Sequence, residues 1–351
     1  HTLRWNPPAL GSAIQQQARE ARYQLLTEWC RKHHVLHLLT AHHQDDQAET
    51  LFFRLARGSG ISGLASMAAV TYTHELRLLR PLLGVDKARL KATLAKAGHG
   101  WVEDASNAKL AYTRNIIRSH LAHAPAQVNS EASMLASRLA TIRNHMEKAQ
   151  ASYSTNSITL YPEGSAILNL QAFRAIPREY GLRLLTGMIQ TLSGDEYSVR
   201  SGKLERLYSD IMADHGSRSR TLGGLQFISA PNETLLMCRE PRSAAKVLLL
   251  PPGKTMRWDQ RFITSHRHSR PLQVGCLGRA GIRTIKDLRP RLPLLPPRAT
   301  LTALPAFWDL EQLVAVPHIH YQHPDYGNSD CRVHFAPAKS LAGSAFSGMN
   351  S

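Results

Sequence analysis

The 351-residue sequence contains few cysteines and no long hydrophobic run. Its cysteines, Cys30, Cys238, Cys276 and Cys331, are isolated and form no CxxC spacing, which argues against a structural zinc site and against a disulfide framework. No stretch approaches the roughly 20 apolar residues that a membrane helix requires, so no membrane partner is expected. Isolated thiols favour a reducing compartment, and we expect a cytoplasmic protein.

Acidic residues are also scarce. There are 26 Asp and Glu against 43 Lys and Arg, which gives a net charge of +17 with neutral histidines. This excess is typical of a protein that binds a polyanion such as nucleic acid. A basic surface that serves only solubility is the alternative.

The sequence begins at His1 without the basic start and apolar core of a signal peptide. We interpret this beginning as that of a fragment or a truncated gene product.

Hydrophobic periodicity predicts an α/β domain over residues 1–125, with a doubly wound parallel sheet. The spacing predicts a helix over residues 12–34, a strand over 35–40 and a second apolar run over 75–85. A further helix follows Asp86, which can cap its start, and ends at Gly98. Strands that alternate with helices are typical of parallel sheets.

The remainder of the chain has a different pattern. Residues 126–240 predict a helical middle domain that ends in a hairpin around Asn232. The Pro- and Arg-rich segment 241–271 indicates a linker, and residues 272–330 indicate a small mixed α+β domain. The small polar residues of 331–351 predict a disordered tail.

The segment 40–67 carries the candidate chemistry. A helix from about Asp45 places Ala48, Leu51, Phe52 and Leu55 on one apolar stripe, which we expect to pack against the sheet. The opposite face carries Asp45, Asp46 and Glu49, and His42 and His43 stand just ahead of it.

Three carboxylates and two imidazoles at this spacing could hold a cationic amine or Mg²⁺, or assist proton transfer. Capping of a helix start explains one acid, and for Asp45 we favour that explanation. The turn at Arg57 and Gly58 fits either a helix C-cap or a close approach to phosphate.

The segment AHHQDDQAETLFFRLARGSGISGLASM closely resembles the signature of tRNA(Ile)-lysidine synthetases, in which HHxDDxxET precedes RGSGxxGL. Further matches follow in the order of the family: AREARY at 18–23, RPLL at 80–83, WVEDASN at 101–107 and TRNIIR at 113–118. A C-terminal element over 277–316 resembles the small basic domain of the family more weakly.

The resemblance implies an adenine nucleotide alpha hydrolase-like fold and an ATP-dependent ligase. Such an enzyme adenylates the C2 oxygen of the wobble cytidine of tRNA(Ile) with the CAU anticodon, and the amine of free L-lysine then displaces AMP. ATP with Mg²⁺ is the implied cofactor. The oligomeric state stays open, with a homodimer as one alternative.

The matching positions imply site residues. His42, Asp46, Glu49 and Arg114 are the implied catalytic residues, and Arg22, Asp45, Glu49, Arg57 and Gly58 the substrate-binding ones. Asp46 and Glu49 suit the lysine ammonium, and Arg22 and Arg114 offer forked donors to phosphate oxygens. Pairing with nearby acids, such as Glu103 or Asp104 for Arg114, is the structural alternative. Arg279, Arg283, Lys286 and Arg298 resemble positions that grip tRNA phosphate, with solvated surface charge as their alternative.

The sequence departs from the family in one respect. No SGGxDS loop is found, although such a loop holds the ATP phosphates in the family. We therefore expect that a first strand–loop–helix unit is missing and that these 351 residues alone have little lysidine synthesis activity.

Two other functions compete with this one. A tRNA thiolase of the same class would need suitably placed cysteines, which the isolated thiols do not provide. A non-catalytic tRNA-binding protein is favoured by the absent loop and opposed by the acidic cluster, which is unhelpful to an RNA binder.

Overall fold

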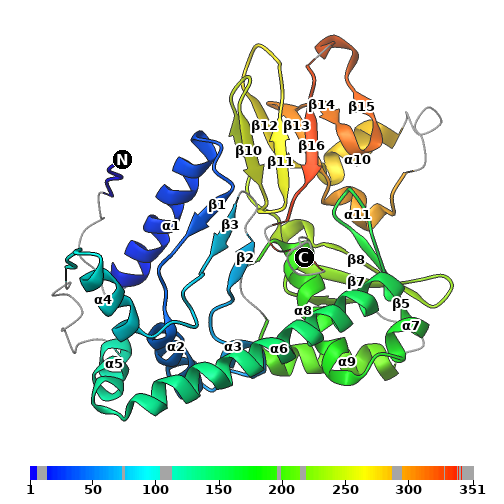
Figure 1. Cartoon of the computed structure of the whole chain (residues 1–351). Helices are drawn as coiled ribbons and strands as arrows, with labels where there is room; N and C mark the ends of the chain where they lie inside the picture. The colour runs from blue at the N-terminus through cyan, green and yellow to red at the C-terminus, as the bar shows by residue number, and fades with distance from the viewer. Residues whose placement is uncertain are drawn as a thin grey trace. The chain divides into compact units, whose positions relative to one another are not determined.

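The computed structural model describes residues 1–5, 14–72, 76–102, 113–195, 199–213, 219–286, 295–327, 329–337, 339 and 341. The chain forms two compact units, one built on His1–Glu147 and the other on Lys148–Ala345. Each is described by itself below, with the element labels of Figure 1. In the described part of the chain, no helix combines the length and apolar character needed to cross a bilayer.

The first unit is an α/β structure around a small sheet. Its elements are α1 (Ile14–Lys32), β1 (His37–Leu39), α2 (Gln44–Ala56), α3 (Ile61–Leu64), β2 (Val70–Tyr72), β3 (Arg77–Leu79), α4 (Lys87–Lys96), α5 (Thr113–His123) and α6 (Ala126–Ser157), whose last turns belong to the second unit. The strand order is β1-β3-β2. β1 and β3 are parallel, as the alternation of strands and helices predicts, whereas β2 is antiparallel to β3.

Local sequence accounts for the helices of this unit. Tyr23 and Cys30 of α1 pack with Leu76 and Leu78, so α1 covers one face of the sheet. The Asp86 carboxylate accepts a hydrogen bond from the Arg89 backbone N–H at 2.7 Å, which caps α4 as expected. Gly98 follows α4 with a φ of +71°, the left-handed conformation that a helix-terminating glycine adopts.

The apolar stripe of α2 packs differently from expectation. Ala48 and Leu51 are buried, but their cluster consists of helical neighbours that include Leu121 of α5 and Ala132 of α6. Leu55 is 55% exposed. The expected contact of this stripe with the sheet is therefore wrong, because α5 and α6 supply the covering surface.

The second unit begins with a five-stranded antiparallel sheet in the order β4-β5-β8-β7-β6. Its elements are β4 (Ile158–Leu160), β5 (Ala166–Asn169), α7 (Leu170–Arg174), α8 (Arg178–Ser193), α9 (Ser201–Ala213), β6 (Arg220–Leu222), β7 (Leu225–Ala230) and β8 (Thr234–Arg239). The β7–β8 hairpin turns at Asn232 as expected, with a φ of +59°. The middle region is therefore not purely helical: β4 and β5 are too short to give a clear alternating pattern.

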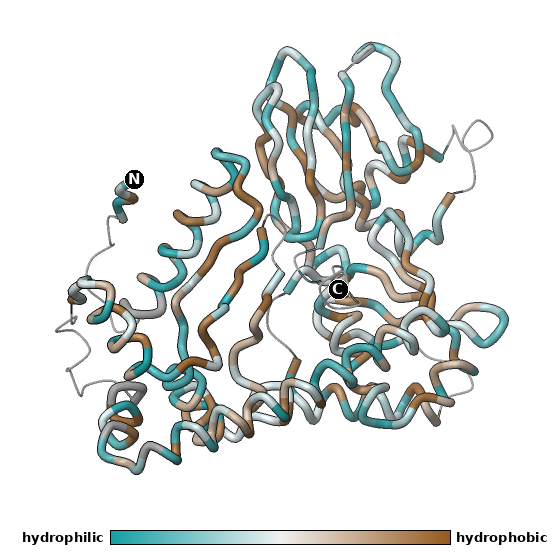
Figure 2. The backbone as a smooth tube through the Cα atoms, viewed as in Figure 1, coloured by the Kyte–Doolittle hydropathy of each residue, from teal (hydrophilic) through white to brown (hydrophobic). Residues whose placement is uncertain are grey.

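The chain then forms two further sheets. They contain β9 (Leu248–Leu250), β10 (Thr255–Trp258), β11 (Phe262–Ser265), β12 (Leu272–Cys276), β13 (Pro305–Asp309), β14 (Gln312–Val316), β15 (Tyr321–Gln322) and β16 (Arg332–Phe335), with α10 (Gly278–Lys286) and α11 (Arg298–Thr302) beside them. The segment 241–271 thus contributes strands where a linker was expected. β16 pairs with β11, so the expected disordered tail begins as a strand. Along these strands hydrophobic residues predominate, whereas hairpin ends are mostly hydrophilic (Figure 2).

A buried charged cluster joins the two parts of the second unit. Asp259, in the β10–β11 turn, accepts hydrogen bonds from Arg239 of β8 at 3.1 Å and from Arg261 at 2.7 Å. The Ala245 backbone N–H donates to the same carboxylate at 2.8 Å. All three charged side chains are buried. A single carboxylate therefore balances two buried guanidinium groups.

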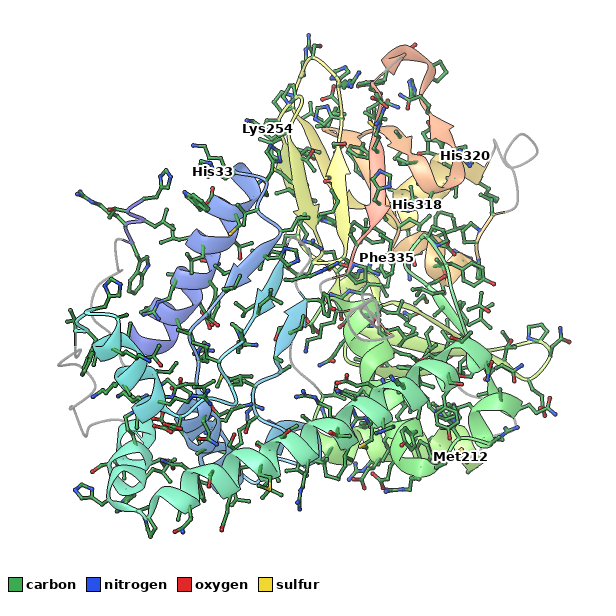
Figure 3. The ribbon with its side chains drawn as sticks, viewed as in Figure 1. His33, Met212, Lys254, His318, His320 and Phe335 are labelled. Carbon is green, nitrogen blue, oxygen red and sulfur yellow. The ribbon has the colours of Figure 1, made fainter. Side chains whose placement is uncertain are left out.

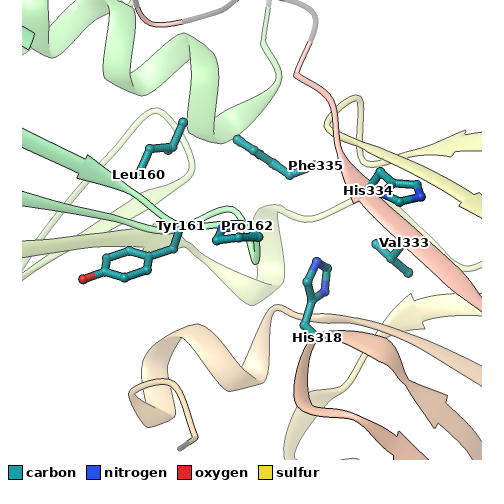
Figure 4. A pocket seen from close by; sticks show the side chains of 7 residues that line it. All are labelled: Leu160, Tyr161, Pro162, His318, Val333, His334 and Phe335. Carbon is teal, nitrogen blue, oxygen red and sulfur yellow. The ribbon is translucent and has the colours of Figure 1, made fainter. Parts of the chain in front are cut away.

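A pocket of 410 Å³ lies near this cluster, between the end of β4 and β16. Its walls are mostly apolar, and the ring of His318 stands between Pro162 and Val333 (Figure 4). Figure 3 places His318 and Phe335 of this pocket among the side chains of the whole chain. Burial lowers the pKa of His318 from 6.5 to about 4, and the charges of His334 and Arg261 act in the same direction. His318 is consequently neutral in the folded protein at neutral pH.

Because His318 is buried in its neutral form, we expect the folded protein to lose stability in acid. Below pH 6.5 the unfolded chain binds a proton at His318 that the folded chain excludes, so stability falls until the pH reaches about 4. His318→Gln should remove about 1–3 kcal/mol of that fall. Urea unfolding between pH 7.5 and 4.5 measures it, with exposed His320→Asn as the control. Identical pH profiles for parent and His318→Gln would contradict the assignment.

Candidate functional site

The first turn of α2 stands at the carboxyl end of β1. The Thr40 backbone N–H donates to the Leu79 carbonyl at 2.9 Å, and the Gln44 N–H donates to the Val85 carbonyl at 2.9 Å. These bonds hold the β1–α2 connection beside the chain that leaves β3. Open α/β sheets bind ligands at this edge.

Two carboxylates of α2 meet one guanidinium there. Glu49 accepts from Arg118 of α5 through both oxygens, with Nε–Oε1 at 2.5 Å and Nη2–Oε2 at 2.9 Å. The Asp46 Oδ1 lies 3.8 Å from Arg118 Nη2. Asp45 is also close enough to act on Arg118 electrostatically. The cluster of Asp45, Asp46, Glu49 and Arg118, here called the acidic cluster, therefore carries more negative than positive charge.

The pKa of Arg118 shows the same balance. The hydrogen bond to Glu49 is the largest cause that raises it, and the charges of Glu49, Asp46 and Asp45 add to this effect against desolvation. The guanidinium is thus firmly charged. One further cation would bring the cluster closer to neutrality.

The two histidines ahead of α2 have different partners. The Thr40 hydroxyl and His42 Nδ1 lie 2.9 Å apart. The His43 backbone N–H donates to Asp46 Oδ2 at 3.0 Å, which fixes that carboxylate at the helix start. His43 Nε2 is 3.5 Å from the same oxygen. Asp46 is therefore the third residue of a capping box whose N-cap is His43, so the capping role expected of Asp45 falls to its neighbour.

The polar face of α2 is held by backbone contacts. The Gln47 side-chain amide donates to the Met67 carbonyl and accepts from the Met67 N–H, both at 2.9 Å. Arg54 donates to the carbonyls of Gly63 at 2.5 Å and Ser66 at 3.1 Å. The RGSGxxGL segment is thereby folded back along α2.

Arg57 and Gly58 lie at the other end of this helix. Gly58 has a φ of +65° and its N–H donates to the Leu55 carbonyl at 2.9 Å, the geometry of a C-cap. Arg57 is exposed and lies over the Phe53 ring. With about 1.5 Å of rise per residue, Arg57 is about 16 Å along the axis from Asp46, so only a large substrate could reach both ends.

Arg22 and Arg114, the two arginines implied for phosphate binding, lie on different helices of the first unit. Arg22 is exposed on α1, one residue after buried Ala21. Arg114 is the second residue of α5, and its side chain lies outside the described part. Glu103 and Asp104, its alternative partners, are also outside the described residues.

Sequence reasoning overlooked Arg118. It is the last residue of TRNIIR and stands four positions after Arg114, so both positions fall on one side of a helix. The available signal was the surplus of acids on α2, where three carboxylates outnumber the single cation, Arg54. The partner lies 69 residues away, which no local pattern specifies.

The basic candidates of the second unit lie on two neighbouring helices. Arg279, Arg283 and Lys286 of α10 and Arg298 of α11 are all exposed. Ile285 and Leu301 anchor the two helices in a common hydrophobic cluster. The four cations, here called the basic surface, can therefore face a polyanion while the apolar side of α10 is buried.

Mg²⁺ binding is not supported by the described side chains. Across the ranges that the structure describes, no three His, Cys, Asp or Glu side chains are arranged to hold a metal ion. Arg118 also takes both oxygens of Glu49, one of the carboxylates that were considered as ligands. The acidic cluster thus fits an amine better than a metal.

Comparisons with known proteins match both parts of the chain. A family model described as a PP-loop domain matches residues 4–124, which include the acidic cluster. A tRNA(Ile)-lysidine synthase from Ruegeria pomeroyi is 33% identical over 323 residues, covering 90% of this chain and 73% of the relative. The enzyme of the same name from Rickettsia akari is 32% identical over 338 residues, covering 93% and 76%.

A third relative bears the same name. The tRNA(Ile)-lysidine synthase of Wolbachia sp. subsp. Brugia malayi is 34% identical over 268 residues, which is 74% of this chain. The matched part spans 61% of that relative's length.

Proposed function

The chain belongs to the tRNA(Ile)-lysidine synthase family, and on this premise we propose that it takes part in joining L-lysine to the wobble cytidine of tRNA(Ile) with the CAU anticodon. In the proposed reaction, the C2 oxygen of the cytidine attacks the α-phosphorus of ATP and pyrophosphate leaves. The amine of lysine then attacks C2, AMP leaves with the oxygen, and the amine gives up a proton. The PP-loop match supports ATP as a substrate.

The acidic cluster is the observation that supports this proposal most. Its net negative charge at the carboxyl end of β1 suits the lysine ammonium, and Asp46 is 22% exposed and so open to a ligand. His42 is proposed to assist proton transfer, and Arg22 and Arg114 to contact phosphate. Mg²⁺ is proposed to arrive on the ATP phosphates, and no step is assigned to it.

The thiolase alternative is weakened by the cysteines. Burial raises the pKa of Cys238, Cys276 and Cys331 to about 11, and Cys30 is buried as well. A thiol with such a pKa holds little thiolate at neutral pH, and the thiolate is the reactive form. Cys238, Cys276 and Cys331 are therefore poorly suited to sulfur transfer.

An assay of AMP release tests the proposed function. The chain is assayed as it stands and with the SGGxDS segment of a family member joined ahead of residue 1. Release that requires both L-lysine and tRNA(Ile) in either version supports the proposal. Release that is unchanged when lysine is omitted, or none in either version, would contradict it.

The basic surface predicts a salt-dependent contribution to tRNA binding. Each lost phosphate contact should reduce the slope of log affinity against log salt by about 1, so Arg279→Ala with Arg283→Ala should reduce it by about 2. The slope is measured by filter binding of tRNA at salt concentrations from about 50 to about 300 mM. Lys203→Ala with Arg206→Ala on exposed positions of α9 is the control of equal charge. Equal slopes for the two double variants would mean that Arg279 and Arg283 of α10 do not contact tRNA phosphate.

A further inference from the structure

Asp46 and Glu49 differ in how their oxygens are used. Both oxygens of Glu49 accept from Arg118, and the Glu49 side chain is only 7% exposed. A substrate amine could use only the remaining lone pairs of these oxygens, to which the burial of the side chain leaves little access, or would have to displace the guanidinium. A bidentate guanidinium–carboxylate pair is among the strongest hydrogen-bonded arrangements in proteins, so such a replacement is unfavourable.

Asp46 has more room for a ligand. One of its oxygens accepts from the His43 N–H, while Oδ1 faces Arg118 at 3.8 Å, beyond a short hydrogen bond. Its side chain is three times as exposed as that of Glu49, at 22% against 7%. An amine can therefore approach Asp46 without disturbing the Glu49–Arg118 contact.

The Glu49–Arg118 contact also joins two helices. Glu49 is in the middle of α2 and Arg118 in the middle of α5, and the apolar residues Leu51 and Leu121 pack in one cluster beside them. The α2–α5 interface therefore combines this ion pair with the apolar contacts of Leu51 and Leu121. It sets the position of α5 and hence of its first turn, which includes Arg114.

We infer that Glu49 and Arg118 form a positioning pair that fixes α5 on α2, and that Glu49 acts on the reaction through Arg118 without contacting lysine. This inference rests on the proposed function. It separates two acids that the resemblance treats alike: Asp46 meets the amine, and Glu49 holds the helix that carries Arg114. Arg118 thereby becomes a residue required for catalysis but not for lysine affinity.

The test separates lysine affinity from turnover. Replacing Arg118 alone would leave the buried Glu49 carboxylate uncompensated, so the informative variant is the double replacement Glu49→Gln with Arg118→Gln, which removes both charges. We expect it to bind L-lysine within about threefold of the parent by calorimetry, because Asp46 is intact. Its kcat for lysine-dependent AMP release, measured against the parent with the SGGxDS segment joined ahead of residue 1 in both, should fall by about 10- to 100-fold, because α5 is no longer fixed.

Single variants complete the design. Glu49→Gln, which keeps a side-chain acceptor for Arg118, should also keep lysine affinity while lowering kcat. Asp46→Asn should weaken lysine binding with the α2–α5 contact in place, and thermal unfolding reports whether each variant is folded. A loss of more than tenfold in lysine affinity in folded Glu49→Gln, or an unchanged kcat in the double variant, would overturn the positioning role. Failure of the parent to bind lysine would instead count against the proposed function.

Discussion

Replacing Asp259 with asparagine is expected to lower the free energy of unfolding of the second unit by about 3–5 kcal/mol, the loss typical of breaking a buried ion pair. The substitution leaves the buried Arg239 and Arg261 without a carboxylate. The turn itself should tolerate it, because Asp259 has a φ of +51° and asparagine accepts the left-handed region. Urea denaturation followed by circular dichroism measures the loss.

A surface aspartate provides the matched control for Asp259. Asp330 pairs with Arg267 and Arg332 in the same unit, but both arginines are well exposed. Exposed pairs contribute little to stability, so Asp330→Asn should leave the unfolding curve nearly unchanged. Equal effects of the two substitutions would mean that Asp259 is not the anchor of this unit.

Glycines make the same turn a point of close packing. A Cβ on Gly194, at the end of α8, would come within 2.9 Å of the Asp259 carbonyl oxygen. A Cβ on Gly164 would come within 2.9 Å of the Phe262 ring. Both glycines also have positive φ values. The β10–β11 turn is thus closely packed against the β4–β5 turn and the end of α8, in addition to its own charged cluster. Loss of the Asp259 charge should therefore destabilise the whole second unit.

Replacing Asp46 with asparagine is expected to reduce kcat/KM for lysine by about 100-fold, which corresponds to about 2.7 kcal/mol. The amide keeps an oxygen for the His43 N–H but removes the negative charge that suits an ammonium group. The rate of AMP release at increasing lysine concentrations measures the effect. Most of the loss should appear in KM.

Asp45→Asn serves as the control for Asp46. Asp45 is also in the first turn of α2, so the favourable effect of a negative charge on the helix dipole is removed equally in both variants. Asp45→Asn should reduce kcat/KM for lysine by less than about fivefold, since dipole effects are worth about 0.3–1 kcal/mol. A similar loss in both variants would indicate a general charge effect, not a specific amine contact.

Local sequence signals predicted much of the first unit. The apolar spacing located α1 and α2, and Asp86 and Gly98 marked the ends of α4, because caps and periodicity depend on residues within a few positions. The same reasoning placed the acids at the start of α2. It could not identify Arg118, because the fold alone brings α5 to α2.

The second unit was less predictable for a related reason. β4 and β16 are three and four residues long, and their pairing partners β5 and β11 are set by turns and tertiary contacts. The segment 241–271 was rich in Pro and Arg, which suggested a linker, yet its Arg261 is buried against Asp259. A buried arginine paired with an acid two residues away in the same turn has the composition of a loop and the role of a core residue.

Binding of L-lysine and of norleucine, which lacks only the side-chain amine, tests the central claim most directly. Calorimetry on the parent and on Asp46→Asn compares the two ligands under identical conditions. We expect the parent to prefer lysine by at least about 30-fold, or about 2 kcal/mol, and Asp46→Asn to abolish most of this preference. Equal binding of lysine and norleucine by the parent, or an undiminished preference in Asp46→Asn, would contradict an amine site at the start of α2.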